Sequence, residues 1–81
     1  MTDSAIAARL INALEAAADR EAGAKTALVS VNIEMLTRAD AGSVEVRVAR
    51  KTRTLVFMSA EFNTDGGAKV ANASSVHKVL S

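Results

Sequence analysis

The chain has 81 residues, no cysteine, one histidine and a formal net charge of +1, from ten Lys and Arg against nine Asp and Glu. Disulfides are excluded, a single histidine cannot build a histidine-rich metal site, and the balanced charge gives no overall field that favours nucleic acid. Two phenylalanines are also too few for a base-stacking surface, so we expect neither a metal nor a nucleic acid as a partner.

The first segment of the chain predicts one long helix, from about residue 3 to residue 21. Thr2, Asp3 and Ser4 are candidate N-caps, and Gly23 is a candidate stop signal. Most apolar side chains fall on one face of such a helix, namely Ile6, Ala7, Leu10, Ala13, Leu14 and Ala17. Polar residues interrupt the segment, so it predicts no membrane span, and its start lacks the basic region of a signal peptide. We therefore expect a cytoplasmic protein without a membrane partner.

The opposite helix face is unusual because Ala5, Ala8 and Ala16 surround Asn12, where a solvated face usually carries Lys and Glu. Small side chains allow another backbone to come close. Alanine is also the best helix former, so the same pattern has a plain explanation in helix propensity. The sequence leaves both readings open.

From residue 26 the hydrophobic period changes from that of a helix to two, which is the period of a half-buried strand. The stretches "RADAG", "RKTR" and "NTDGG" separate the apolar runs, and the last of them is a strong hairpin signal. These signals predict four antiparallel strands that pair in chain order as a meander. The expected strands are residues 26–36, 43–50, 53–62 and 68–79.

Residues 1–81 therefore predict a single α+β domain, in which one long helix packs on a four-stranded antiparallel sheet. We expect the apolar helix face to pack against alternate residues of the first two strands and against Phe57 or Phe62. The expected contacts on the first strand are Val29, Val31 and Ile33. A domain of this size buries only about 60–65% of its unfolded surface, and such domains often add a partner chain. We expect a homodimer or a homotetramer.

Two stretches carry a resemblance to a known family. "TALVSVNIEML" resembles the strand after the central helix of hotdog-fold acyl-CoA thioesterases of the phenylacetyl-CoA thioesterase type. "SVEVRVARKTRTLVFMSAEFNTDGGAKVANASSVHKVL" resembles their remaining strands, and the likeness covers Ser4 to Leu80. The resemblance implies a hotdog-like fold, in which a curved sheet wraps one helix, and an activity on acyl-CoA thioesters. It implies no cofactor besides the coenzyme A that belongs to the substrate.

The chain departs from that family where catalysis depends on it. The family usually has a strand and a loop ahead of the helix, whereas this sequence begins almost at the helix. "DSA" stands where the family often has His-Gly-Gly, and Asn12 stands where it has the carboxylate that acts as general base or nucleophile. An amide is not usefully basic, so Asn12 can only orient a water. Glu15, about 60° around the helix, is a candidate for a substitute carboxylate, although both side chains also fit a solvated helix face.

Three basic residues, Arg50, Lys51 and Arg53, follow the second strand. Family members often hold the coenzyme A phosphates with basic residues near strand ends, so the resemblance implies this role here. A solubilising turn that protects a sheet edge is the alternative explanation. His77 is a lone histidine on the last strand and is predicted to be a surface or edge residue rather than a catalyst. Ser74 and Ser75 are near it in the sequence, but no Ser–His–carboxylate spacing indicates a triad.

The leading functional interpretation is a thioesterase-like hotdog protein acting on acyl-CoA thioesters, with weakened hydrolysis. The alternative is a non-catalytic hotdog remnant that serves as an assembly or acyl-ligand-binding module. A third interpretation is that the chain is a piece of a longer product whose first strand lies upstream. Position 12 separates the first two, because Asp there would favour the enzyme and Asn favours the module.

Overall fold

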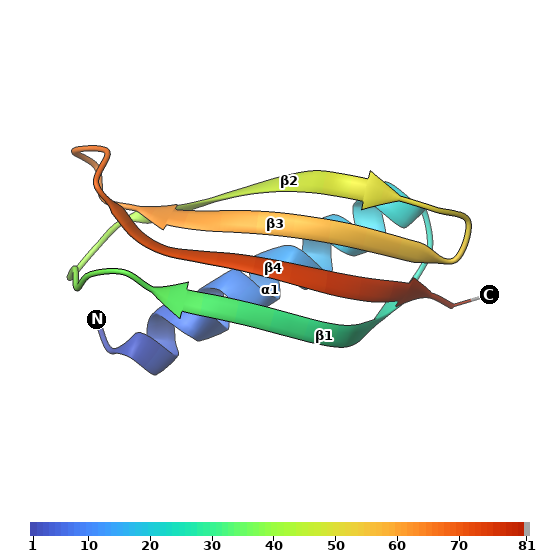
Figure 1. The fold of residues 1–81 in the computed structure, drawn as a ribbon, viewed down its shortest axis with the longest axis horizontal. Coiled ribbons are helices and arrows are strands. Elements are labelled where there is room, and N and C mark those ends of the chain that lie inside the picture. The colour runs from blue at the N-terminus through green and yellow to red at the C-terminus, as the bar shows by residue number, and fades with distance from the viewer. Residues whose placement is uncertain (81) are drawn as a thin grey trace.

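The computed structural model describes residues 1–80, which form one helix and four strands (Figure 1). In chain order these elements are α1 (Asp3–Ala22), β1 (Thr26–Met35), β2 (Ser43–Lys51), β3 (Leu55–Asn63) and β4 (Lys69–Val79). The predicted α+β arrangement, with one helix on a four-stranded antiparallel sheet, is confirmed. None of the described residues forms a helix with the length and hydrophobicity that a membrane crossing requires.

Local signals at both ends define α1. The side-chain oxygen of Thr2 accepts a hydrogen bond from the backbone N–H of Ala5 at 3.1 Å, which is the N-cap arrangement that the sequence predicts. Gly23 ends the helix in the left-handed conformation, with φ at 66°, and its N–H contacts the carbonyls of Asp19 and Arg20. Glycine adopts this conformation without the steric cost that a side chain would add.

The strand order is β1-β4-β3-β2, so the prediction of a meander is wrong. β1 and β2, which are consecutive in the chain, lie at opposite edges of the sheet, and β1 pairs with β4 instead (Figure 1). Residues 36–42 make this crossing over the ends of the central strands. The N–H groups of Leu36 and Thr37 donate to the Val70 carbonyl at 2.8 and 3.1 Å as the connection passes β4. Three strand spacings amount to about 14 Å, which a connection of this length can span.

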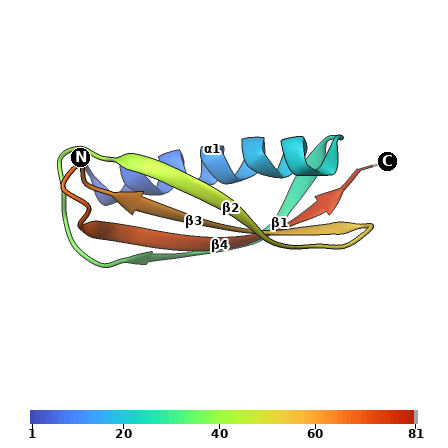
Figure 2. The same ribbon diagram turned by 90° about the horizontal axis from the view of Figure 1, so that it is seen from above.

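The helix covers one face of the sheet, and the core fills the space between these two layers (Figure 2). Its largest fully buried apolar side chains come from α1, β3 and β4: Ile6, Leu10, Leu14, Val56, Phe62 and Val70. Most of the core residues that the sheet contributes come from the central strands β3 and β4, because strands on both sides shield them from solvent. Of the two phenylalanines, Phe62 is the core residue, whereas Phe57 alternates with buried neighbours and belongs to the other face.

The expected core contacts of the edge strands are only partly present. Val31 and Ile33 pack against the core while remaining partly exposed, but Val29 is 60% exposed. Its strand changes register between Leu28 and Ser30, and Val29 is the extra residue at that irregularity. A bulge of this kind interrupts the alternation of side chains, so a strict period of two assigns Val29 to the wrong environment.

Candidate functional site

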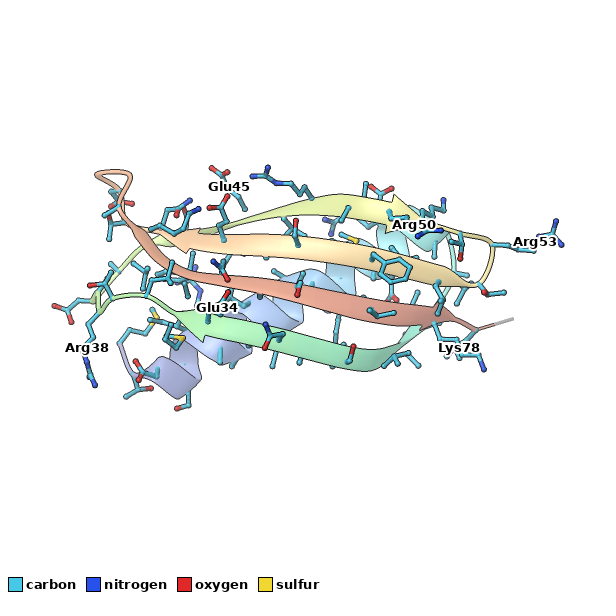
Figure 3. The ribbon with its side chains drawn as sticks, viewed as in Figure 1. Glu34, Arg38, Glu45, Arg50, Arg53 and Lys78 are labelled. Atoms are coloured by element: carbon cyan, nitrogen blue, oxygen red, sulfur yellow. The ribbon has the colours of Figure 1, made fainter. Side chains whose placement is uncertain are left out.

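The candidate catalytic and coenzyme-binding residues lie on different faces of the two-layer molecule. Asn12 and Glu15 are exposed on α1, whereas the buried side of that helix faces the sheet. Arg50 lies on the far side of the sheet, because it pairs with Phe57 of β3 and its guanidinium carbon lies 5.9 Å from the centre of that ring (Figure 3). The structure therefore does not bring these predicted site residues together within one chain.

Asn12 and Glu15 are neighbours on the helix surface, since residues three apart occupy the same side of successive turns. Within residues 1–80, no hydrogen bond or ion pair holds either side chain in place. An amide and a carboxylate in open solvent cannot exclude bulk water from a reaction. This pair can belong to an active site only where another surface covers it.

The start of α1 borders a hollow of about 260 Å³ lined by Asp3, Met35, Leu36, Thr37 and Arg38. The first backbone N–H groups of a helix have no partner within the helix and carry partial positive charge, which suits a developing oxyanion. Here the carboxylate of Asp3 lies in the same first turn and opposes a second negative charge. The helix start is therefore a weaker oxyanion site than one opened by glycines.

Arg50, Lys51 and Arg53 do not form one cluster. The Lys51 ammonium points to the helix side of the sheet and donates to the Glu21 carbonyl at 2.6 Å, at the negative end of the α1 dipole. Arg50 lies over Phe57 on the other side, and Arg53 extends from the turn after β2 (Figure 3). Lys51 thus has a structural role, which leaves Arg50 and Arg53 free of such contacts within residues 1–80.

His77 is buried, so its prediction as a surface or edge residue is wrong. The side chain is 0% exposed on the helix side of β4, and its Nε2 lies 2.7 Å from the Oγ of Ser75, which is 4% exposed. The Nδ1 atom has no partner within residues 1–80. Burial lowers the pKa of His77, while the charges of Glu15 and Asp19 act in the opposite direction. The period-two pattern of β4, with alanines at 71 and 73 on the same face, is the sequence signal that identifies this burial.

Asp19, the second helix carboxylate near His77, has a structural role because it is hydrogen-bonded to Thr26. Its Oδ1 accepts hydrogen bonds from the Thr26 backbone N–H at 2.9 Å and the Thr26 hydroxyl at 2.7 Å. These two bonds lower the pKa of Asp19 and tie the last turns of α1 to the start of β1. Asp19 therefore has no free oxygen pair for chemistry at this end of the helix. No group of three or more metal-ligating side chains occurs among the described residues.

No protein-family model and no curated protein matches this chain. Several solved structures do resemble it, including the following three. The BH2602 protein of Bacillus halodurans, solved with CoA, matches 99% of this chain at a TM-score of 0.89 and 17% identity, and the match covers 56% of that protein. A protein of the thioesterase superfamily matches 99% of the chain at a TM-score of 0.85 and 15% identity, over 62% of its own length.

The third structure is a candidate thioesterase of Ralstonia eutropha JMP134 related to phenylacetic acid degradation. It is 29% identical over 70% of this chain, at a TM-score of 0.62, and the match covers 44% of its length. The chain thus spans between 44% and 62% of these neighbours. The likenesses confirm the hotdog fold that the sequence resemblance predicts, with thioesterase-superfamily proteins among the neighbours.

Proposed function

We propose that this chain is a thioesterase-like hotdog protein that binds acyl-CoA thioesters and hydrolyses them weakly. The observation that carries the proposal is the match over 99% of the chain to a protein solved with CoA and to a thioesterase-superfamily protein. The likeness to the Ralstonia protein supports it further, at 29% identity. Coenzyme A enters as part of the substrate, and the chemistry that we propose requires no additional cofactor.

The weakness of hydrolysis follows from Asn12. Thioester hydrolysis needs a group that removes a proton from the attacking water and donors that stabilise the oxyanion. The Asn12 amide can orient a water through a hydrogen bond but cannot accept its proton at neutral pH. Glu15 lies on the same exposed helix side and is our second candidate for the base. Its carboxylate would act only when a covering surface reduces its contact with solvent.

A second copy of the chain is the covering surface that we propose. Ala8 and Ala16 are exposed on the same helix face as Asn12, and their small side chains allow a second helix to approach closely. The free edge of β1 offers another contact, since Leu28 and Val29 are 38% and 60% exposed there. Either contact gives a homodimer, and both together give a tetramer. Sedimentation velocity at micromolar concentration tests this, and a stable folded monomer would contradict it.

For the coenzyme A phosphates we propose Arg53 together with Arg50, because Lys51 is bonded to the end of α1. Both guanidinium groups project from the same end of the sheet (Figure 3). Since this end and Asn12 lie on different faces of one chain, a substrate that touches both fits best between two copies. The phosphates would bind one copy and the thioester would approach the helix of the other.

The alternative function is a non-catalytic module that binds acyl ligands or supports assembly. Asn12 favours it, because the position at which the resemblance implies a carboxylate holds an amide. Calorimetric titration with a thioether analogue of an acyl-CoA, beside a hydrolysis assay with the matching thioester, distinguishes the two. We expect saturable binding with slow turnover. Binding without any turnover would support the module, and absence of binding would contradict both functions.

A further inference from the structure

The face of the sheet that points away from α1 carries an ordered arrangement of side chains. Strand pairing aligns Ser30, Val76, Phe57 and Arg50 in one row across β1, β4, β3 and β2. The next row across the same four strands contains Asn32, Ser74, Ser59 and Arg47. Both edge strands change register beside the first row, β1 between Leu28 and Ser30 and β2 between Val48 and Arg50. Bulges of this kind redirect side chains and often occur beside binding sites.

A hollow of about 320 Å³ lies over these two rows. Phe57 and Val76 are its large apolar lining side chains, and Ser30, Ser59 and Ser74 add hydroxyl groups around them. All five are at least partly exposed to solvent. The volume is at the lower end of the range of about 300–1,000 Å³ that is usual for ligand sites, so it suits a small molecule. Its apolar lining with a few polar groups is also typical of such sites.

The charges around this hollow are unequal at its two ends. Arg50 lies over the Phe57 ring, and no acidic side chain within residues 1–80 pairs with it. Lys78 extends from the end of β4, close to the same end of the sheet, whereas Glu34 and Glu45 lie toward the other end (Figure 3). An amphipathic anion would therefore be oriented with its charge toward Arg50 and Lys78.

Two other cations of this face, Arg47 and Lys69, are paired with one carboxylate. Glu61 accepts from Arg47 at 3.0 Å and from Lys69 at 2.8 Å, and these contacts lower its pKa. They lie in the adjoining hollow of about 280 Å³, whose lining residues are mostly polar or charged. The first hollow differs from the second because its lining is mainly apolar and carries no charged side chain. The unpaired Arg50 guanidinium lies beside that lining, over the Phe57 ring.

We infer that the hollow over Phe57 and Val76 binds a small aryl or short acyl carboxylate, with its apolar part on these two side chains and its carboxylate on Arg50. The planar guanidinium can donate two parallel hydrogen bonds to a carboxylate, and its position over the ring limits its freedom before binding. Lys78 adds positive charge at the same end. The inference does not rest on catalysis at Asn12, because the hollow and Asn12 lie on opposite faces. It shares Arg50 with the phosphate contact proposed above, and the titration therefore leaves coenzyme A out.

The test is a titration of 4-phenylbutyrate into the isotopically labelled protein, without coenzyme A, followed by amide chemical shifts. We expect saturable shifts centred on residues 57, 59, 74 and 76. Because a hydrogen bond to a charged group is involved, Arg50→Gln should weaken binding by about tenfold or more. Phe57→Ala should weaken it as well, and neutral 4-phenylbutanamide should bind more weakly than the acid. The exposed Arg20→Gln, on α1, is the matched control and should leave binding unchanged.

Several results would overturn the inference. Equal affinities for the acid and the amide, or for the native and Arg50→Gln proteins, would remove the role of the guanidinium. Shifts confined to α1 would place the ligand on the wrong face. Shifts of the same residues that depend on protein concentration without ligand would mean that a second copy covers this face. The amide spectrum of each variant shows directly whether it is folded, so loss of binding and loss of fold are separated.

Discussion

Ser75 and His77 form a hydrogen-bonded pair inside the core, with 2.7 Å between the serine Oγ and the histidine Nε2. The charged groups of α1 that act on the ring are Glu15 and Asp19, and its strand neighbours are Leu28 of β1 and Val56 of β3. The two carboxylates favour the charged ring, but burial outweighs them and lowers the pKa of His77 below its ordinary value of 6.5. The folded protein therefore holds the neutral imidazole.

This pair predicts a loss of stability in mildly acidic solution. Below about pH 6.5 the unfolded chain takes up a proton at His77 that the folded chain does not, so the free energy of unfolding falls with pH until the folded pKa is reached. Urea unfolding at several pH values between 7.5 and 5 measures this. His77 is the one histidine of the chain, and Asp19 and Glu61 titrate at lower pH because their pKa values are lowered. The decline should disappear in His77→Gln, and the same decline in that variant would contradict the account.

The contrast between Leu10 and Val29 tests the assignment of the core. Leu10 is 0% exposed and Val29 is 60% exposed, although the sequence predicts both as core residues. Leu10→Ala should lower the free energy of unfolding by roughly 2–5 kcal/mol. Val29→Ala should change it by less than about 0.5 kcal/mol. Chemical denaturation of both variants measures the difference, and similar losses would show that β1 sits differently on the helix.

Gly42 marks the place where the connection from β1 reaches the other edge of the sheet. A Cβ atom here would overlap the Asn63 carbonyl oxygen and approach the Phe62 ring, whereas at Gly66 the nearest atom would be Thr64 Oγ1 at 3.9 Å. We expect Gly42→Ala to cost about 1–3 kcal/mol of stability, because the closely packed connection must shift. Gly66→Ala is the matched control and should be nearly neutral. If both are neutral in thermal unfolding, residues 36–42 take another path.

Some of these features can be predicted from local signals in the sequence, and others cannot. The helix, its caps and the apolar face with Leu10 follow from local periodicity and short-range signals, and the structure agrees with them. The strand that pairs with β1 cannot be predicted in this way. "RADAG" looks like a turn whether the next strand lies beside β1 or at the far edge of the sheet. Pairing of β1 with β4 depends on contacts between residues far apart in the chain, and the local hydrophobic pattern does not indicate it.

The positions of the candidate site residues are also hard to predict from the sequence, because they depend on irregularities in the strands. The bulges at Val29 and before Arg50 decide which face each following side chain occupies, and period-two patterns do not reveal them. Arg50 and Lys51 look like one basic group because "RKTR" resembles a turn, whereas β2 continues through Lys51 and places consecutive side chains on opposite sides of the sheet. The alternation in β4 indicates the burial of His77, although a lone histidine on the last strand resembles a surface residue.

Lys51 and Arg53 are expected to respond differently to substitution. Lys51→Met removes the bond to the Glu21 carbonyl and should cost about 0.3–1 kcal/mol of stability, the usual size of a helix-end charge effect. It should leave coenzyme A binding nearly unchanged. Arg53→Ser should weaken binding of an acyl-CoA analogue and reduce its salt dependence, with no change in stability. Calorimetry and urea unfolding of both variants measure these effects, and the reverse pattern would contradict the proposed phosphate contact.

The central proposal is that this chain has a hotdog fold with an amide, Asn12, at the position where the resemblance implies the catalytic carboxylate. The most direct measurement is the rate of acyl-CoA hydrolysis by the native protein and by Asn12→Asp, with Ala16→Asp as the control that places a carboxylate one turn further along the same exposed face. We predict slow or undetectable hydrolysis by the native protein and by the control. Asn12→Asp should be faster by up to roughly 10²–10⁴-fold, the usual contribution of a general base. Equal rates for all three proteins would contradict the claim, and fast native hydrolysis that survives Asn12→Ala would move the catalytic role to Glu15 or elsewhere.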